Sequence, residues 1–251
     1  MRDSAMIQVY VISLASSLAR RESIQRQFNE AGIRFEFFDA IDGRKDPHPL
    51  FERQDVVLRK KLCGIPLLPG ELGCFASHYL LWQRCVELNE SIVVVEDDAE
   101  LKDTFASALP HLTDLANKHG YVRLFENETT HRKRVLVEHW DDIGSDVVRY
   151  LKGPASTRAY LLHPSAAEKF LTHAARWYKP VDDYMDEFWI NGVECKGLVP
   201  GIVNDETDFE SEIKEQVVGY KERTLAAKIE REWLRLKSDL QRLVFNLRKS
   251  L

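Results

Sequence analysis

The sequence predicts an α/β protein built on a mostly parallel β-sheet. Short runs rich in β-branched and aromatic residues alternate with segments of helical periodicity along most of the chain. The apolar run at residues 92–95 has no polar interruption, which is typical of a strand covered by helices on both faces. Hydrophobic residues make up 44% of the 251-residue chain, enough for the core of one large domain or of a domain with an appendage.

The first elements are expected to form a β-α-β unit. Residues 7–13 are rich in β-branched and aromatic side chains and predict a strand. A helix is expected over 17–30, where Gly32 ends it. A second strand is expected over 34–38, closed by the turn-like pair Asp42-Gly43. Because strands joined by a helix lie parallel, this order predicts a parallel sheet.

The rest of the chain continues the alternation. Residues 46–68 contain three prolines and predict loops with a short helix. The elements expected after them are a helix over 71–88, a strand over 91–96, a helix over 103–118, a strand over 121–125, a hairpin region over 134–148 interrupted by Gly144, a strand over 157–162, helices over 165–175 and 181–190, and a long final helix from near Tyr220. Ligands of such sheets bind beyond the carboxyl ends of the strands. That rule directs attention to Ser13, to the turn after Phe38 and to the residues after Val95.

The C-terminal segment differs from the rest of the chain in charge. Residues 219–251 carry nine Lys/Arg and four Asp/Glu, a net charge of +5, whereas residues 1–218 carry 26 basic and 36 acidic residues, a net charge of −10. We therefore expect an acidic domain over 1–218 and a basic amphipathic helix over 219–251. An acidic domain repels phosphate backbones, so no nucleic-acid partner is expected.

Apolar residues of this C-terminal segment recur every three or four positions and predict one continuous stripe along a helix. The stripe consists of Leu225, Ile229, Trp233, Leu236, Leu240, Leu243 and Leu247. Such a helix can lie on an anionic membrane surface. It can equally pack on the domain, or pair with a second copy of the chain in a homodimer.

The sequence predicts a cytoplasmic protein, with possible peripheral association with the inner face of the cytoplasmic membrane. No apolar run approaches the roughly 20 residues that span a bilayer, and the N-terminus lacks the order of a signal peptide. The cysteines form no C-x-x-C pair, so we expect reduced thiols rather than a structural zinc site. They are Cys63, Cys74, Cys85 and Cys195.

Three consecutive carboxylates, Glu96, Asp97 and Asp98, follow the most apolar predicted strand. Their mutual repulsion is costly unless a cation neutralises it, and oxygen ligands suit Mg²⁺ or Mn²⁺. Strand alternation places Glu96 and Asp98 on one side and Asp97 on the other. A metal held there can bridge a diphosphate. The alternative interpretation is that the carboxylates cap a helix beginning at Ala99.

Other phosphate chemistry receives less support from the sequence. A phosphohydrolase with an aspartyl nucleophile would carry carboxylates at the end of its first strand, but that strand ends Val11-Ile12-Ser13-Leu14. The glycine-rich motifs of P-loop and dinucleotide-binding proteins are also absent from the sequence.

Several blocks of the sequence, in order over about residues 7–200, together resemble glycosyltransferase family 25. This family contains bacterial lipooligosaccharide galactosyltransferases and the galactosyltransferase domains of collagen-modifying enzymes. The blocks are Val11-Ile12-Ser13-Leu14 with Arg20-Arg21, Phe37 to Gly43, Gly70 to His78, Glu96-Asp97-Asp98, Ala159 to Leu162 with Ala166 to Lys169, and Pro180 to Met185.

The resemblance implies a glycosyltransferase A-type fold, a nucleotide-sugar donor, most often UDP-galactose, and inversion at the anomeric carbon. It implies that Mn²⁺, or Mg²⁺, is bound by Glu96 and Asp98, with a third ligand unassigned. We therefore expect an inverting β-galactosyltransferase acting on a lipid-linked lipooligosaccharide acceptor. A glucosyltransferase, a metal-dependent phosphohydrolase and an inactive nucleotide-sugar-binding module are the alternatives.

The resemblance also indicates site residues. Asp182 lies at the family's position for the general base, with Asp183, Asp186 and Glu187 as further candidates and an N-cap as the structural alternative. Side chains expected to meet the donor are Ser13, Leu14, Arg20, Asp39, Ser77, His78 and Asp97. For several of them a structural role is the competing interpretation: Asp39 in a turn, His78 as a buried helix residue, Arg20 on an exposed helix face.

Overall fold

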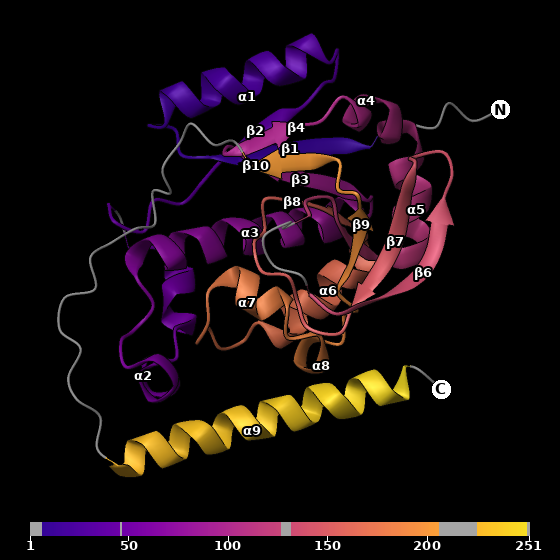
Figure 1. Cartoon of the computed structure of the whole chain (residues 1–251). Helices are drawn as coiled ribbons and strands as arrows, with labels where there is room; N and C mark the ends of the chain where they lie inside the picture. Colours follow the sequence, from indigo (N-terminus) through magenta and orange to yellow (C-terminus); the bar gives the residue numbers. More distant parts are fainter. Residues whose placement is uncertain (1–6, 46, 127–131, 206–224, 250–251) are drawn as a thin grey trace.

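The computed structural model describes residues 7–45, 47–126, 132–205 and 225–249, and its centre is an eight-stranded sheet (Figure 1). In spatial order the strands are β2 (Glu36–Asp39), β1 (Gln8–Ser13), β3 (Ile92–Glu96), β8 (Ala159–Leu162), β5 (Tyr121–Arg123), β9 (Lys196–Val199), β7 (Ser145–Tyr150) and β6 (Arg134–Trp140). A separate two-stranded sheet pairs β4 (Ala99–Leu101) with β10 (Val203–Asp205).

Strand directions confirm the predicted α/β class and the mostly parallel sheet. β1 is parallel to β2 and β3, and β5 is parallel to β9. β8 is antiparallel to β3 and β5, and β7 is antiparallel to β9 and β6. Six of the eight strands therefore run in one direction, and β8 and β7 run in the other.

Helices cover both faces of the sheet, as the uninterrupted apolar strand predicts. The α-helices of the described chain are α1 (Leu18–Glu30), α2 (Val56–Cys63), α3 (Pro69–Leu88), α4 (Thr104–Ala108), α5 (Leu112–His119), α6 (Pro164–His173), α7 (Val181–Met185), α8 (Phe188–Asn191) and α9 (Leu225–Arg248), of which α9 packs on α2 and α8 rather than on the sheet. Figure 1 shows α1 and α4 on one side of the sheet and α3, α6 and α7 on the other.

Side chains of β1 alternate between two apolar clusters, one on each face. Tyr10 and Ile12 belong to the cluster that includes residues of α3, α6 and α7. Val9 and Val11 belong to the cluster that includes residues of α1, α4 and α5. Because both faces are buried, a shift of one residue in strand register would exchange the two sets, so the packing fixes which residues end the strand.

The predicted helix over 103–118 is divided in the structure. α4 ends at Ala108, a 3₁₀ turn covers Leu109–His111, and α5 begins at Leu112. Pro110 lies in this turn, where its ring and its missing N–H prevent a continuous α-helix.

Two further expectations differ from the structure. The predicted helix over 181–190 is divided into α7 and α8. Residues after the carboxylate cluster form β4 rather than a helix beginning at Ala99, because β10 pairs with them. The cluster therefore does not cap a helix.

The amphipathic C-terminal helix is confirmed as α9, which lies along one side of the body (Figure 1). The ring of Phe245 packs against Phe188, and Asn246 hydrogen bonds with Arg149 and with the carbonyl of Leu151. The predicted start near Tyr220 and the proposed boundary at 218/219 lie outside the described residues. Within the described chain, every helix is too short or too polar to span a membrane.

The apolar stripe of α9 does not pack on the body. All its predicted members are exposed, and Val244 extends it. Exposed fractions range from 39% for Val244 to 74% for Leu225. An apolar surface of this length on one helix indicates a binding surface. The alternative in which the stripe packs on the domain is therefore not what the structure shows.

Candidate functional site

A cleft opens at the carboxyl ends of β1 and β3, where the strand order predicted a ligand site. Its walls come from the ends of both strands, the turn after β2 and the first turns of α3. The lining residues are Ile12, Ser13, Leu14, Arg20, Ala40, Ile41, Asp42, Gly43, Arg44, Gly70, Cys74, Ser77, His78, Glu96, Asp97 and Asp98. The structure thus brings together the three carboxylates and all predicted donor-site residues except Asp39.

Asp97 is held by β1 and α1. Its carboxylate accepts a hydrogen bond from Oγ of Ser13 at 2.6 Å and forms an ion pair with Arg20 at 3.1 Å. Burial raises the pKa of Asp97, although these two partners oppose the shift. Arg20 is therefore tied to the carboxylate cluster rather than placed on an exposed helix face.

Glu96 accepts hydrogen bonds from two neighbouring elements. Nε2 of His78, on α3, lies 3.1 Å from Oε1 of Glu96, and Oγ1 of Thr157 donates to the same oxygen at 2.5 Å. Burial opposes ionisation, but these bonds and the charge of Arg158 outweigh it and lower the pKa of Glu96. Glu96 is therefore an ionised, oriented carboxylate.

A buried chain of donors assigns the tautomer of His78. Nε1 of Trp82 donates to Oη of Tyr160 at 3.1 Å, which leaves the hydroxyl of Tyr160 to donate to Nδ1 of His78 at 2.9 Å. Nδ1 then accepts, so the ring proton is on Nε2, facing Glu96. His78 is fully buried, as the structural interpretation expected, yet it also acts on the cleft.

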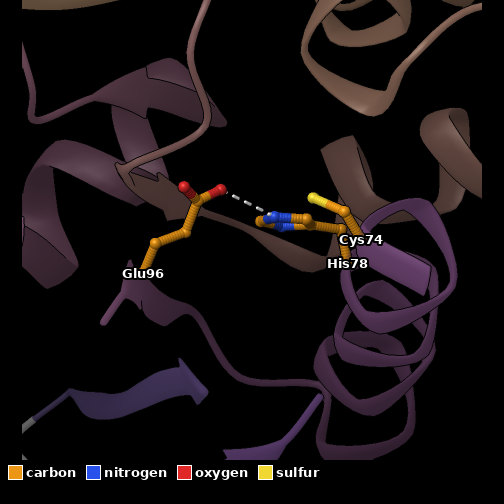
Figure 2. Close-up of side chains that lie close together, drawn as sticks. All are labelled: Cys74, His78 and Glu96. Carbon is orange, nitrogen blue, oxygen red and sulfur yellow. Dashed lines mark hydrogen bonds and ion pairs between the residues drawn. The ribbon is translucent and has the colours of Figure 1, made fainter. Parts of the chain in front are cut away.

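Cys74 faces the same two side chains (Figure 2). Ligand atoms of Cys74, His78 and Glu96 lie within 4.8 Å of one another, a spacing that can hold a metal ion. Burial, together with nearby carboxylates, raises the pKa of the Cys74 thiol well above its usual range. A protonated thiol is a poor ligand, and His78 already uses both nitrogens, so the trio is better described as a part of the cleft wall in which His78 and Glu96 are hydrogen-bonded.

Asp98 shares a guanidinium with a residue far along the chain. Nε and Nη2 of Arg158 donate to Asp98 at 3.3 and 3.4 Å, and Nη1 forms an ion pair with Asp205. The pairing of β10 with β4 places Asp205 opposite Ala99, next to Asp98. Burial and the charge of Glu96 raise the pKa of Asp98 to about 6.

The carboxylate oxygens of this cluster fit a hard divalent cation as ligands. Two closely spaced carboxylates, Glu96 and Asp98, line one cleft. A third carboxylate, that of Asp205, forms an ion pair with Arg158, which also pairs with Asp98. Burial and the charge of Glu96 raise the pKa of Asp98 although the charge of Arg158 opposes the shift. Carboxylate oxygens are the ligands that Mg²⁺ and Mn²⁺ prefer.

Ser77 and two glycines join α3 to the turn after β2. Oγ of Ser77 donates to the carbonyl of Gly73 at 2.8 Å and accepts from the amide of Ile41 at 2.9 Å. A Cβ on Gly73 would lie 2.2 Å from the carbonyl oxygen of Ile41, and one on Gly43 would lie 2.0 Å from that of Pro69. Ser77 therefore shapes the cleft wall rather than presenting a free hydroxyl.

Asp39 lies outside the cleft lining. Its side chain is 73% exposed and forms an ion pair with Arg21, whose guanidinium also donates to the carbonyl of Ser13. The structure thus places Asp39 at the rim, on the end of β2 beside Ser13.

The loop over 153–157 positions Thr157 and Arg158. Two successive residues, Ala155 and Ser156, have φ values of 64° and 66°. Such conformations cost about 1–3 kcal/mol each and cluster at functional sites. Asp186 accepts from the amide of Ala155 at 2.8 Å, and Asp182 accepts from that of Ser156 at 3.3 Å. Carboxylates of the 182–186 segment therefore hold the strained loop.

The two predicted base candidates face different surroundings. Asp182 is half-buried and lies near enough to Cys74, in the cleft wall, for its charge to contribute to the raised pKa of that thiol. Asp183 is exposed and lines a second cavity together with Asp186 and Glu187. The charge of Asp182 thus acts on the wall of the cleft described above, whereas Asp183 lines the second cavity.

Sequence reasoning missed Thr157, Arg158 and Asp205. Thr157 and Arg158 act on carboxylates about 60 residues earlier, through the antiparallel pairing of β8 with β3. No motif marks either residue, and Asp205 follows a three-residue strand too short to predict.

Comparisons with known proteins show the family of this chain. The family model described as Glycosyltransferase family 25 (LPS biosynthesis protein) matches residues 6–185. A "Glycosyltransferase 25 family member" of Aedes aegypti is 30% identical over 214 residues, which cover 76% of this chain and 33% of that protein. The "Lipooligosaccharide biosynthesis protein lic2B" of Haemophilus influenzae is 43% identical over 93 residues, 37% of this chain and 34% of that protein.

Another relative has a different name. The "Inactive glycosyltransferase 25 family member 3" of Mus musculus is 30% identical over 188 residues, 71% of this chain and 31% of that protein. The chain spans about a third of the length of the curated relatives it matches. The family model covers most of the chain, including the cleft and α7 up to its last residue. The chain therefore belongs to glycosyltransferase family 25.

Proposed function

We propose that this chain is an inverting glycosyltransferase that transfers galactose from UDP-galactose to a hydroxyl of a lipooligosaccharide acceptor. The observation that carries the proposal is the cluster Glu96, Asp97 and Asp98, gathered with Ser13 and His78 in one cleft of a family 25 chain. The name of the Haemophilus influenzae relative supports the acceptor class.

The proposal includes a divalent metal ion, Mn²⁺ or Mg²⁺. Asp98 would hold it, with Glu96 and Asp205 as the carboxylates available beside it. When bound, the ion would supply positive charge that stabilises the departing UDP. Arg158 neutralises part of the same cluster, and Asp97 keeps Arg20 beside the cleft as a further cation for phosphate.

The proposed base is Asp182. In an inverting transfer the acceptor oxygen bonds to the anomeric carbon as the bond to UDP breaks, and a base takes the acceptor proton. Asp182 reaches the loop over 153–157 and lies near Cys74 in the cleft wall. Asp183 remains the second candidate, on the side of the second cavity.

We further propose that the stripe of α9 lies on an anionic membrane surface, where a lipid-linked acceptor would be found. Residues 225–248 carry six Lys/Arg and three Asp/Glu, a net charge of +3, on a chain whose total is −5. The apolar side chains are exposed while the opposite side of the helix, at Phe245 and Asn246, contacts the body. A basic helix that presents apolar side chains outward is complementary to anionic lipid.

Three alternatives remain to be distinguished by the test. A glucosyltransferase would use the same cleft with UDP-glucose. A phosphohydrolase is disfavoured because β1 ends at Ser13, without a carboxylate for a covalent intermediate. The third alternative is an inactive nucleotide-sugar-binding module. The mouse relative is named inactive, but retention of all three carboxylates argues against this alternative for the present chain.

The experiment is a transfer assay with purified full-length chain, Mn²⁺ and a panel of UDP-sugars on an oligosaccharide acceptor. We expect UDP-galactose to be the preferred donor and nuclear magnetic resonance to show an inverted, β-configured product. Preferred transfer from UDP-glucose would replace the donor. Release of free sugar without transfer to any acceptor, or binding of UDP without turnover, would reject the proposal.

A further inference from the structure

A second cavity lies across the loop over 153–157 from the donor cleft. Its walls are formed by α2, by the residues around Gly153, by the segment from Tyr178 to Ile190 and by the body-facing side of α9. Of the roles assigned above, only that of Asp183, the second base candidate, involves this cavity. It is a cavity between α9 and the body rather than an exposed surface patch.

The cavity has an excess of unneutralised positive charge. Six cations and four carboxylates line it. Three of the carboxylates have cationic partners: Asp186 pairs with Arg123, Glu187 with Lys179, and Asp239 with Arg242. Arg235 pairs with Glu232, and the lining cations that form no ion pair with a carboxylate in the described part of the chain are Arg132, Lys152 and Lys237.

A neighbouring hollow extends this cationic surface. It is lined by Arg132, Lys133, Lys152 and Arg242, with Leu151 as its one uncharged lining residue among those described. These side chains come from three separate segments of the chain, so the fold gathers them. Like charges repel one another, and their convergence is favourable when an anion binds between them.

Aromatic side chains lie beside these cations. The guanidinium of Arg242 lies 5.6 Å from the centre of the Trp189 ring, and Tyr178 contributes a second ring to the cavity wall. Aromatic faces offer flat apolar contact, and their polar edges serve hydrogen bonding. Nε1 of Trp189 has no hydrogen-bond partner among the described residues.

The cavity is joined to the donor cleft through the strained loop. Asp186 lines the cavity and accepts from the amide of Ala155, while Thr157, two residues later, donates to Glu96 in the cleft. A Cβ on Gly153 would lie 1.9 Å from Cγ of Asp186, so the loop packs directly on α7 and its C-terminal end. A ligand in the cavity therefore lies a single loop away from the carboxylates of the cleft.

We infer that this cavity binds the acceptor, as a saccharide that carries a phosphate or carboxylate group. The cations bind the anionic group and the aromatic rings contact the sugar. The identification of the bound saccharide as the acceptor rests on the proposed function, but the binding itself does not require catalysis. It makes the enzyme selective for acidic over neutral acceptors.

The test measures binding to the full-length chain without donor or metal. Glucose 6-phosphate, glucuronate, glucose and inorganic phosphate are titrated by calorimetry against the wild type, the double variant Arg132→Ala/Lys152→Ala and the control Lys169→Ala, an exposed lysine of α6. We expect at least one of the two anionic sugars to bind more than about ten-fold tighter than glucose and inorganic phosphate. The double variant should lose that difference and the control should keep it.

Three results would overturn the inference: equal binding of anionic and neutral sugars, binding of inorganic phosphate as tight as that of the anionic sugar, or unchanged binding in the double variant. Kinetics separate this test from that of the proposed function. Normal transfer with an unchanged KM for an acidic acceptor in the double variant rejects the subsite alone. Binding that behaves as expected, without transfer from any UDP-sugar, rejects the proposed function alone.

Discussion

Nε2 of His78 lies 3.1 Å from Oε1 of Glu96, which joins the middle of α3 to the end of β3. The hydroxyl of Tyr160 lies 2.9 Å from Nδ1 on the other side of the ring, and burial of Glu96 is opposed by the hydrogen bond with His78, which helps to lower the pKa of Glu96. Glu96 thereby keeps a defined orientation in a cleft that Asp97 and Asp98 also line.

Replacing His78 by Phe should remove this donor while keeping a ring in the helix. Of the two hydrogen bonds that Glu96 accepts, from His78 and Thr157, only the one from Thr157 would remain, and the hydroxyl of Tyr160 would lose its acceptor. Each lost hydrogen bond should lower the free energy of unfolding by about 1–3 kcal/mol. We expect the melting temperature to fall by several degrees and the affinity for UDP with Mn²⁺ to fall more than about ten-fold. Differential scanning calorimetry and titration calorimetry check the two effects; unchanged UDP affinity would limit His78 to a core role.

Asp205 is expected to contribute to metal binding although it lies over 100 residues after the carboxylate cluster. Arg158 pairs with both Asp98 and Asp205, which places the two carboxylates around one cation. Asp205→Asn should weaken Mn²⁺ binding more than about ten-fold, as measured by electron paramagnetic resonance of free Mn²⁺. Glu100→Gln, an exposed change on β4, is the matched control. Equal Mn²⁺ affinity in both variants would exclude Asp205 as a ligand.

Asp182→Asn should lower turnover by more than about 100-fold, because the amide cannot take the acceptor proton. The amide oxygen can still accept from Ser156, so the loop and the donor affinity should be nearly unchanged. Steady-state kinetics and UDP titration measure both properties, and Asp183→Asn serves as the comparison. Loss of donor affinity in Asp182→Asn would assign this residue to the loop or donor site. Greater loss of turnover in Asp183→Asn would reverse the assignment of the base.

Substituting charged residues for apolar residues of the α9 stripe should abolish membrane binding and leave transfer to a short free acceptor intact. Leu236 and Leu240 are 67% and 58% exposed, so Leu236→Glu/Leu240→Glu does not disturb the body. We expect the wild type to sediment with anionic liposomes at low salt, less so at high salt, and the double variant to remain free. Gln25→Glu/Asn29→Asp, at two exposed positions of α1, is the control for added charge.

The same α9 variants distinguish a membrane surface from a second copy of the chain. If wild type fails to bind anionic liposomes, and ultracentrifugation shows a dimer that the double variant loses, the stripe is a dimer interface. That outcome would contradict the membrane proposal and support the alternative that the spacing of the stripe permits.

Local periodicity made the strands and most helices predictable. β1, β3 and α3 are buried elements whose apolar patterns extend over many residues, and the carboxylates follow from the end of β3. Ser13 and Asp97 could be placed in one site because the carboxyl ends of parallel neighbours meet at the same edge.

The rest depends on long-range pairing that no local pattern contains. The antiparallel insertion of β8 between β3 and β5 brings Thr157 and Arg158 to the carboxylates. β9 and β10 are short and lack a clear alternation, so Asp205 could not be placed. Asp39 ends its strand as predicted, but its ion pair with Arg21 holds it at the rim.

The central claim is that this cleft binds a UDP-sugar through a metal ion held at Asp98. The most direct measurement is titration calorimetry of UDP-galactose against the wild type and Asp98→Asn, with Mn²⁺ and with a chelator. We expect binding to the wild type with Mn²⁺ and a more than about 100-fold loss on either chelation or substitution. The folded state of Asp98→Asn should persist, because the change relieves repulsion from Glu96. Equal affinity for UDP-galactose in all four conditions would contradict the claim.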